Sequence, residues 1–242
     1  MTKQELNTLI DHLTVAHRTR EDFMKSRMAF ANNMKAVHRN AKRRGVELDI
    51  KEGLDKFVGA SEKEWGKTMG TIAKQLPIHD WFCSHVGCST MGFASIIAET
   101  GDLSNYVNPA KVWRRMGLSV HDGVADKNRT KGENIGYSKR CRMIAYRVSS
   151  AIIKKKGEYR ELYDQRKAYE IERDAEGYNV PYIEKRGKAA MMNAYTTSKK
   201  KIEAGMLPAC VIDLWAQRWM VKRLIRNLWI EWVKELGVVE AI

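Results

Sequence analysis

GCSTMGFASIIAETGD, residues 87–102, is the stretch whose pattern decides the fold. It opens on a glycine, continues through small and apolar residues, and ends on Gly101-Asp102. Glycine reaches backbone conformations that are strained for other residues, so the pattern predicts a tight turn followed by an apolar helix. The turn and the start of that helix would expose unpaired N–H groups and the positive end of a helix dipole. A helical hairpin of this kind offers its donors to a phosphate group.

The residues before the turn allow a second interpretation, a zinc site. HDWFCSHVGCST, residues 79–90, contains four potential ligands: His79, Cys83, His85 and Cys88. The paired Cys-x₂-Cys spacing that is typical of zinc sites is absent, so we expect neither a metal nor another cofactor. The four cysteines of the chain are scattered and do not resemble the disulfide framework of a secreted protein. We therefore expect a reduced, cytoplasmic protein.

The sequence on either side predicts an all-α protein. Residues 2–44 have apolar residues at helical spacing, and Thr2 with Glu5 predicts a capping box. Residues 49–76 predict a second helix that glycines weaken or break, and that folds back on the first or joins a coiled coil. The sequence contains no long alternation of β-branched residues, so we expect little or no sheet. A helical arm over 1–76, used for homo-oligomerisation, is the resulting expectation.

Shorter helices are expected downstream. Their predicted ranges are 91–100, 109–116, 138–156, 158–177 and 208–236. The second of these has Asn108 as its cap, Pro109 in its first turn and Gly117 as its stop, and Ser138 caps the third. Residues 178–207 are polar and carry no clear element. We expect a DNA-binding region over 77–177 and a C-terminal helical region over 178–242.

The C-terminal helix is rich in tryptophan. We expect one apolar stripe along this helix, which packs in the core or at an oligomer interface: Leu214, Val221, Ile225, Leu228 and Trp232. The neighbouring Trp215, Trp219 and Trp229 widen the stripe. The cations of this helix are expected on its other faces: Arg218, Lys222, Arg223 and Arg226.

The positive charge is concentrated in one segment. The chain has a net charge of +14, and residues 108–160 contain 14 Lys and Arg against 4 Asp and Glu, a difference of 10. Such a concentration is typical of a surface that faces phosphates, although a merely solvated basic face is the alternative. An anionic membrane fits less well, because the segment has no lipid-facing aromatic stripe. No apolar run approaches the roughly 18 residues that span a bilayer, and residues 1–8 lack the apolar core of a signal peptide.

A longer run carries a resemblance to a known family. GCSTMGFASIIAETGDLSNYVNPAKVWRRMGL (87–118) is similar to the C-terminal domain of the IS-one-ten family of insertion-sequence transposases, which are bridge-RNA-guided DNA recombinases. The matching positions are Ala98, Glu99, Gly101, Asp102, Pro109, Gly117 and Leu118. GYSKRCRMIAYRV (136–148) resembles the basic segment that comes next in the family, so the resemblance covers about 80–165. It implies a helix-hairpin-helix that engages DNA. The ending at 216–232 suggests a phage- or mobile-element-borne branch.

The chain departs from that family in its chemistry. Ser89 replaces the second turn glycine, and Phe93 replaces a small helix residue. The nuclease-like catalytic half is replaced by a helical rod. The family's nucleophilic serine would fall within residues 124–130, which contain no serine. Ser119 and Ser138 lie nearby but at offset positions. The departures favour a DNA-binding protein without catalysis.

We therefore expect a protein that grips the DNA backbone, duplex or branched, largely without sequence specificity. The residues expected to contact it are Gly87, Cys88, Ser89, Thr90, Lys111, Arg114, Arg115, Lys127, Arg129, Lys131, Lys139, Arg140, Arg142 and Arg147. One alternative is a divergent recombinase or nuclease, or its subunit, that uses Ser138 or Ser119. Another is a phage-encoded inhibitor whose basic face meets structured RNA or an acidic host protein.

Overall fold

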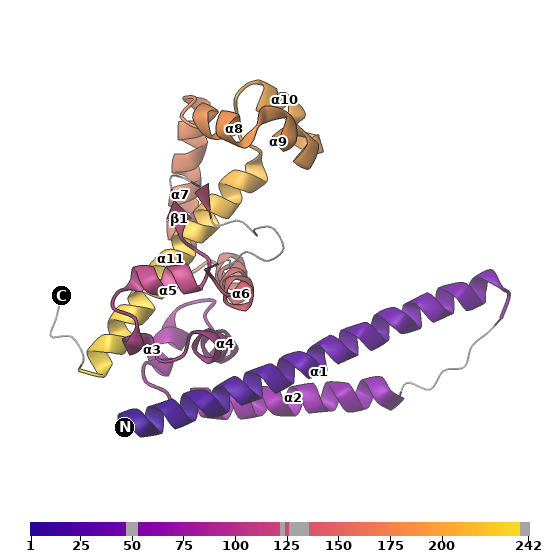
Figure 1. Cartoon of the computed structure of the whole chain (residues 1–242), viewed down its shortest axis with the longest axis vertical. Helices are drawn as coiled ribbons and strands as arrows, with labels where there is room; N and C mark the ends of the chain where they lie inside the picture. Colours follow the sequence, from indigo (N-terminus) through magenta and orange to yellow (C-terminus); the bar gives the residue numbers. More distant parts are fainter. Residues whose placement is uncertain (47–52, 122–123, 126–135, 238–242) are drawn as a thin grey trace.

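The computed structural model describes residues 1–46, 53–121, 124–125 and 136–237 (Figure 1). The prediction of an all-α protein is confirmed. The described part contains two strands of two residues each, β1 (Val120–His121) and β2 (Val124–Ala125), which pair antiparallel. Among the described residues, no helix combines the length and the apolar composition needed to cross a bilayer.

A helical hairpin forms the N-terminal arm. Helix α1 (Lys3–Arg43) packs along α2 (Gly53–Ala73), and the far end of the pair projects away from the rest of the molecule (Figure 1). The predicted capping box is present, because Glu5 N–H donates to Thr2 Oγ1 at 3.2 Å and Thr2 N–H donates to Glu5 Oε2 at 2.7 Å. Together, α1 and α2 are called the arm.

The sequence predicts a second helix that glycines weaken or break, and in the structure it is not broken. Helix α2 is continuous through Gly59, Gly66 and Gly70. A Cβ atom added at Gly66 would lie 3.4 Å from Arg20 Nε, and one at Gly59 would lie 3.7 Å from Arg27 Cδ. The small residues therefore let α1 side chains lie close against α2, and this packing outweighs the low helix propensity of glycine.

The arm leads into a bundle around helix α4 (Thr90–Thr100). The bundle also contains α3 (His79–Ser84), η1 (Leu103–Asn105), α5 (Pro109–Arg115), α6 (Lys139–Lys155), α7 (Glu158–Ala175) and α11 (Ala209–Glu235). The predicted caps are confirmed, since Asn108 and Ser138 accept backbone N–H groups of Lys111 and Cys141.

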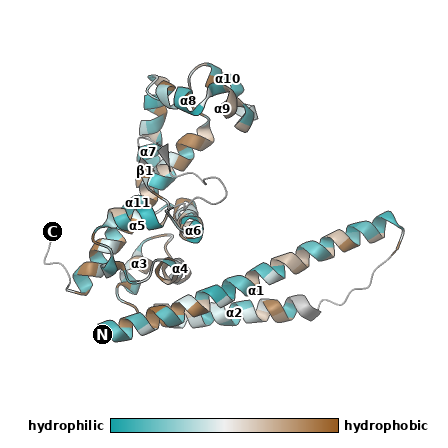
Figure 2. Ribbon diagram, viewed as in Figure 1, coloured by the Kyte–Doolittle hydropathy of each residue, from teal (hydrophilic) through white to brown (hydrophobic). Residues whose placement is uncertain are grey.

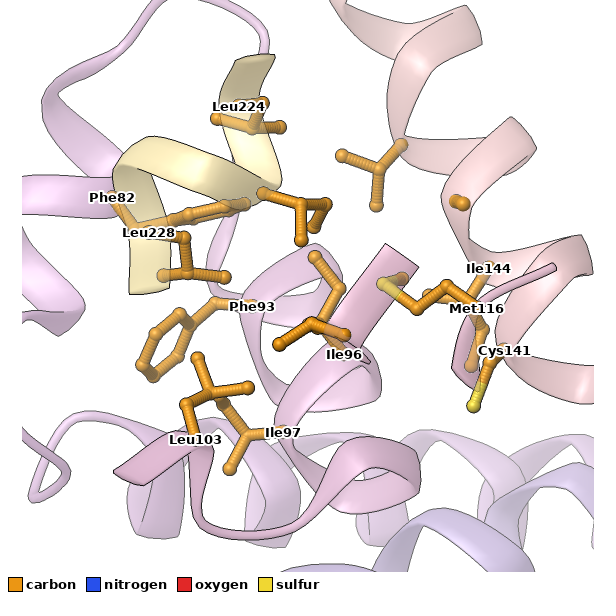
Figure 3. Packing of buried hydrophobic residues seen from close by; sticks show 14 of the residues in the cluster. Phe82, Phe93, Ile96, Ile97, Leu103, Met116, Cys141, Ile144, Leu224 and Leu228 are labelled. Carbon is orange, nitrogen blue, oxygen red and sulfur yellow. The ribbon is translucent and has the colours of Figure 1, made fainter. Parts of the chain in front are cut away.

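The main core of the bundle forms where α4 meets α11. Phe93 and Ile96 of α4 belong to one buried cluster with Leu224 and Leu228 of α11 (Figure 3). Trp232 is fully buried, and its Nε1 donates to Asp102 Oδ1 at 2.9 Å. Part of the arm belongs to the same core, to which it contributes Leu6, Ile10 and Leu13. The start of the arm is thus fixed to the bundle.

Residues 178–207, which the sequence left unassigned, form short helices. These are α8 (Val180–Arg186), α9 (Lys188–Ala194), η2 (Thr196–Ser198) and α10 (Lys199–Glu203). They enclose a second core with the start of α11, made by Ile183, Met191, Ile202, Leu207, Val211 and Ile212. Colouring by hydropathy shows α8–α10 as a mixture of hydrophilic and hydrophobic positions, which explains why no pattern was visible in the sequence (Figure 2).

The predicted stripe of the C-terminal helix is correct except at its start. Val221, Ile225, Leu228 and Trp232 are buried, whereas Leu214 is 44% exposed. Here α11 extends beyond the main core and turns other positions toward the second core. One stripe therefore cannot describe a helix that serves two cores.

Candidate nucleic-acid interface

Gly87 lies in the turn between α3 and α4, where the sequence predicted a glycine turn. Its φ of +91° is in the left-handed region, and a Cβ atom here would lie 2.6 Å from Ile152 Cα of α6. Both the conformation and the close approach of α6 therefore require glycine. One side of the turn is therefore packed against α6, and the Cys88 N–H of the turn donates to His85 O at 3.0 Å.

The residues after Gly87 begin helix α4. Ser89 is exposed and caps the helix, because its Oγ accepts the N–H of Gly92 at 3.2 Å. The Thr90 hydroxyl lies 3.0 Å from His79 Nε2, so it is occupied inside the protein. Cys88 is half-buried against the main core, and this burial raises the pKa of its thiol to about 12. Ser89 is the most accessible of the predicted turn contacts.

A hollow of about 210 Å³ lies at the N-terminus of α4. Gly87, Ser89 and Gly92 line it from the turn, and Arg20 of α1 and Arg147 of α6 line it from the sides. The first N–H groups of a helix have no partner within it, and the helix dipole adds positive potential. The hollow therefore has features of an anion site. Its two guanidinium groups also face acids of the protein, as Arg20 lies 3.3 Å from Glu62.

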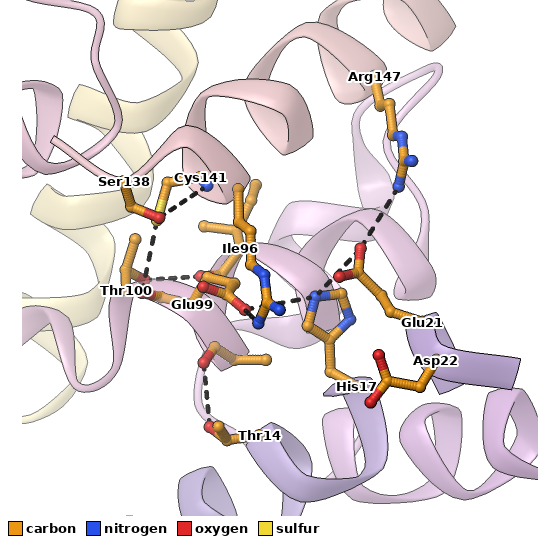
Figure 4. Close-up of polar contacts among 12 residues, drawn as sticks. Thr14, His17, Glu21, Asp22, Ile96, Glu99, Thr100, Ser138, Cys141 and Arg147 are labelled. Atoms are coloured by element: carbon orange, nitrogen blue, oxygen red, sulfur yellow. Dashed lines mark hydrogen bonds and ion pairs between the residues drawn. The ribbon is translucent and has the colours of Figure 1, made fainter. Parts of the chain in front are cut away.

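A buried polar cluster lies between the arm and the bundle (Figure 4). His17, Glu21 and Glu99 are 1%, 2% and 8% exposed, and His17 Nε2 lies 3.9 Å from one oxygen of each glutamate. Arg140 Nη1 lies 3.7 Å from Glu99 Oε1, and Arg147 Nη1 lies 3.8 Å from Glu21 Oε1. Two of the predicted phosphate contacts therefore also neutralise buried acids and connect α6 to α1 and α4.

Burial sets the protonation of His17. Its pKa is lowered because burial disfavours the imidazolium, and Arg20 and Arg140 add to this effect. Glu21 and Glu99 act in the opposite direction without reversing the shift. His17 is therefore neutral at pH 7. No short-range pattern in the sequence pointed to this cluster, because its members come from α1, α4 and α6.

The exposed cations gather where α5 ends and α6 begins. Lys111, Arg114, Arg115 and Lys139 are exposed, and no ion pair joins any of them to a carboxylate within the described residues. Ser138 N–H donates to Arg115 O at 2.9 Å, so the two helix ends are directly joined. These four cations are called the α5–α6 junction.

The ends of these two helices are closely packed where they meet. Gly117 has a φ of +63°, and a Cβ atom there would lie 2.6 Å from the ring of Tyr137. The Arg142 guanidinium lies 5.1 Å from the centre of that ring and donates to Tyr137 Oη at 2.9 Å. Arg142 is thus held beside the junction. Three further predicted contacts, Lys127, Arg129 and Lys131, lie outside the described residues.

Trp113 holds α5 against the bundle. Its Nε1 donates to Lys222 O of α11 at 3.0 Å, and the Lys222 ammonium lies 4.4 Å from its ring centre. With the tryptophan facing α11, the neighbouring Lys111 and Arg114 side chains are left in solvent. The packing therefore fixes the orientation of the junction.

The serines and the His and Cys side chains that the sequence offers for catalysis or metal binding make the following contacts. The Ser138 hydroxyl caps α6 by accepting Cys141 N–H at 3.2 Å, and Ser119 is half-buried. Cys83 Sγ lies 3.4 Å from His79 Nε2, whereas His85 pairs with Glu158. No group of three or more His, Cys, Asp or Glu side chains in the described part of the chain is arranged to hold a metal ion.

A second cationic surface was missed by the sequence reasoning. Arg218 and Lys222, expected on other faces of α11, share one face with Trp215 and Trp219 and line a larger hollow there. Their spacing of i, i+3, i+4 and i+7 was the signal that would have found it.

Comparison with protein-family models, curated proteins and solved structures gives no match for this chain.

Proposed function

We propose that this protein binds nucleic acid, DNA in the first instance, through phosphate contacts at the α5–α6 junction. The observation that carries the proposal is the junction itself: exposed cations from two joined helix ends, without carboxylate partners in the described part of the chain. Residues 108–160 as a whole, with 14 Lys and Arg against 4 Asp and Glu, provide the surrounding positive potential. Contacts of this kind position a protein on the backbone without reading base sequence.

The resemblance of residues 87–118 to the transposase C-terminal domain supports the same proposal. In that resemblance the α3–α4 turn is a helix-hairpin-helix that engages a second phosphate. The hollow beside Gly87 and Ser89, flanked by Arg20 and Arg147, suits an anion of that size. The protein would act as a non-catalytic, transposase-derived DNA-binding protein of a phage or mobile element.

The salt dependence of binding tests the proposal quantitatively. If the four junction cations each neutralise one phosphate, the logarithm of the affinity falls with the logarithm of salt concentration with a slope of about −3.6. The affinity for duplex DNA should then drop about 100-fold between roughly 50 and 200 mM salt. Fluorescence anisotropy with several unrelated duplexes of equal length measures both the slope and the sequence dependence.

A pair of matched variants separates the junction from general charge. In Arg114→Glu/Arg115→Glu we expect weaker binding to all duplexes and a slope shallower by about 2. The control Lys199→Glu/Lys200→Glu makes the same charge change on α10, far from the junction in the chain, and should keep most of the affinity. Equal losses in both variants, or wild-type binding that does not depend on salt, would contradict the proposal.

We also propose that the far end of the arm pairs with a second copy of the chain. Met28 and Val37 of α1 are 54% and 44% exposed, and Phe57 of α2 is 66% exposed. Apolar side chains exposed along a projecting helical pair favour a partner helix. Sedimentation of the wild type should give a dimer or larger species, and Met28→Glu/Phe57→Glu should give a monomer. A monomeric wild type at every concentration tested would exclude the arm as an interface.

A further inference from the structure

A hollow of about 430 Å³ lies between α7, α8 and α11. Its size falls in the range of pockets that hold small organic ligands. Helix α11 contributes Trp215, Arg218, Trp219 and Lys222 to its wall. Two packed helices normally present apolar side chains to each other, so a wall of this composition is unusual for a structural contact.

The facing side of α7 and the edge of α8 are also cationic. Helix α7 contributes Arg166, Glu170 and Arg173 at a spacing of i, i+4 and i+7, so the three share one face. Helix α8 adds Tyr182 and Lys185. These residues and the four from α11 are called the basic hollow. Five cations and one carboxylate line it, so its charge is strongly positive.

The carboxylate does not neutralise the hollow. Glu170 is 2% exposed and pairs with Arg166. Within the described residues, no ion pair joins Arg173, Lys185 or Arg218 to an acid. An anion inside the hollow would supply the charge that the protein itself does not provide.

Several buried polar atoms of the hollow lack partners. The Nε atoms of Arg166 and Arg218 and the Oε2 atom of Glu170 are buried without a hydrogen bond. Lys222 is half-buried beside them, and its pKa is lowered by burial and by the Arg218 charge. These atoms are closed off from solvent, so a ligand in the hollow would instead meet the partly or fully exposed cations Arg173, Lys185 and Arg218.

The aromatic side chains define the rest of that ligand. The rings of Tyr182 and Trp215 lie 5.0 Å apart at 84°, which leaves an aromatic corner on one side of the hollow. The guanidinium groups of Arg166 and Arg223 lie 5.8 and 4.7 Å from the ring centre of Trp219. Aromatic faces beside cations are the surfaces on which proteins stack nucleobases while they hold the phosphate.

We infer that the basic hollow binds one nucleotide unit, with its base against the tryptophans and its phosphate among Arg173, Lys185 and Arg218. The phosphate supplies acceptors for the guanidinium and ammonium groups of these cations. The nucleotide is either free or an unpaired residue of a nucleic acid. This site is separate from the α5–α6 junction on which the proposed function rests, since no junction residue lines the hollow.

Calorimetric titration of the full chain with adenosine monophosphate tests the site, with inorganic phosphate as the reference anion. We expect saturable binding of the nucleotide that is at least about tenfold tighter than that of phosphate, since base stacking adds to the affinity. A parallel titration compares a blunt duplex with one that carries a short single-stranded end. Tight binding of the mononucleotide indicates a free ligand, and a preference for the single-stranded end indicates an unpaired residue.

Three variants locate the binding. Trp219→Leu removes one of the two tryptophan surfaces, and Lys185→Met removes one exposed cation of the hollow, so that the test does not depend on a core substitution. Each should weaken nucleotide binding about tenfold. Arg223→Met is the matched control, because Arg223 contacts the same tryptophan but does not line the hollow, and it should change the affinity less than about twofold.

The outcomes separate this site from the junction. Arg114→Glu/Arg115→Glu should keep the affinity for the mononucleotide or the single-stranded end, and Lys185→Met should keep the affinity for blunt duplex. The inference is overturned if neither the mononucleotide nor the single-stranded end binds more tightly than phosphate and blunt duplex. It is also overturned if Arg223→Met loses as much affinity as Lys185→Met.

Discussion

Gly87→Ala is the substitution that most directly tests the packing of the turn. The structure assigns two costs to it. The left-handed backbone, with φ of +91°, costs a residue with a side chain about 1–2 kcal/mol. The new Cβ atom would lie 2.6 Å from Ile152 Cα, and overpacking of this kind costs a further 1–3 kcal/mol or so. The free energy of unfolding should therefore fall by about 2–5 kcal/mol.

Gly177→Ala is the matched control. Gly177 also has a positive φ, +81°, but nothing lies within 4 Å of an added Cβ atom. It should lose only the conformational part, about 1–2 kcal/mol, so the difference between the two variants measures the contact with α6. Urea unfolding followed by circular dichroism gives both values. If Gly87→Ala loses no more stability than Gly177→Ala, α6 does not pack closely against the turn.

Two further predictions concern the cores. Because the His17 pKa is lowered in the folded state, the unfolded chain takes up its proton first as the pH falls below about 6.5. The free energy of unfolding should thus decrease from pH 7.5 toward roughly pH 5.5, and His17→Gln should reduce this decrease; a decrease of equal size in the variant would contradict the assignment. Leu228→Ala should cost about 2–5 kcal/mol of unfolding free energy and Leu214→Ala less than about 0.5, because they are 0% and 44% exposed. Equal effects in urea unfolding would mean that α11 is rotated from its position in the fold.

Features that depend on a few neighbouring residues could be predicted from the sequence. Thr2, Asn108 and Ser138 cap their helices through contacts with residues three positions later, so the signal lies within one turn. Gly117 and Gly87 have the positive φ angles expected of glycines at helix ends and turns. Turn chemistry of this kind does not depend on the rest of the fold.

Features that depend on distant packing could not be predicted. The continuity of α2 through Gly59 and Gly66 depends on side chains of α1 that lie against it. His17 meets Glu99 from a different helix, at a sequence separation of 82 residues (99 − 17), and no local spacing encodes that contact. For such groups the sequence supplies the residue types but not their partners.

The basic hollow is an intermediate case. The spacing of Trp215, Arg218, Trp219 and Lys222 was visible, but tryptophan on a helix was interpreted as core because large aromatic residues are usually apolar contacts. What changes the interpretation is the other wall, where α7 presents Arg166 in place of an apolar side chain. The proposal that this cation–aromatic face binds a ligand therefore depends on the facing helix, which does not cover it with apolar side chains.

The same reasoning applies to the charge of residues 108–160. A count of cations treats all of them as equal, yet Arg140 and Arg147 lie against Glu99 and Glu21, acids that lie outside that segment. Part of their charge is used to hold the arm on the bundle, and desolvated acids left without these cations would be costly. Lys111 and Arg114 have no such acids in the described part of the chain, so their positive potential is available to an external phosphate. The strength of a nucleic-acid surface therefore depends on which cations the fold leaves unpaired, and the total charge of the segment overstates it.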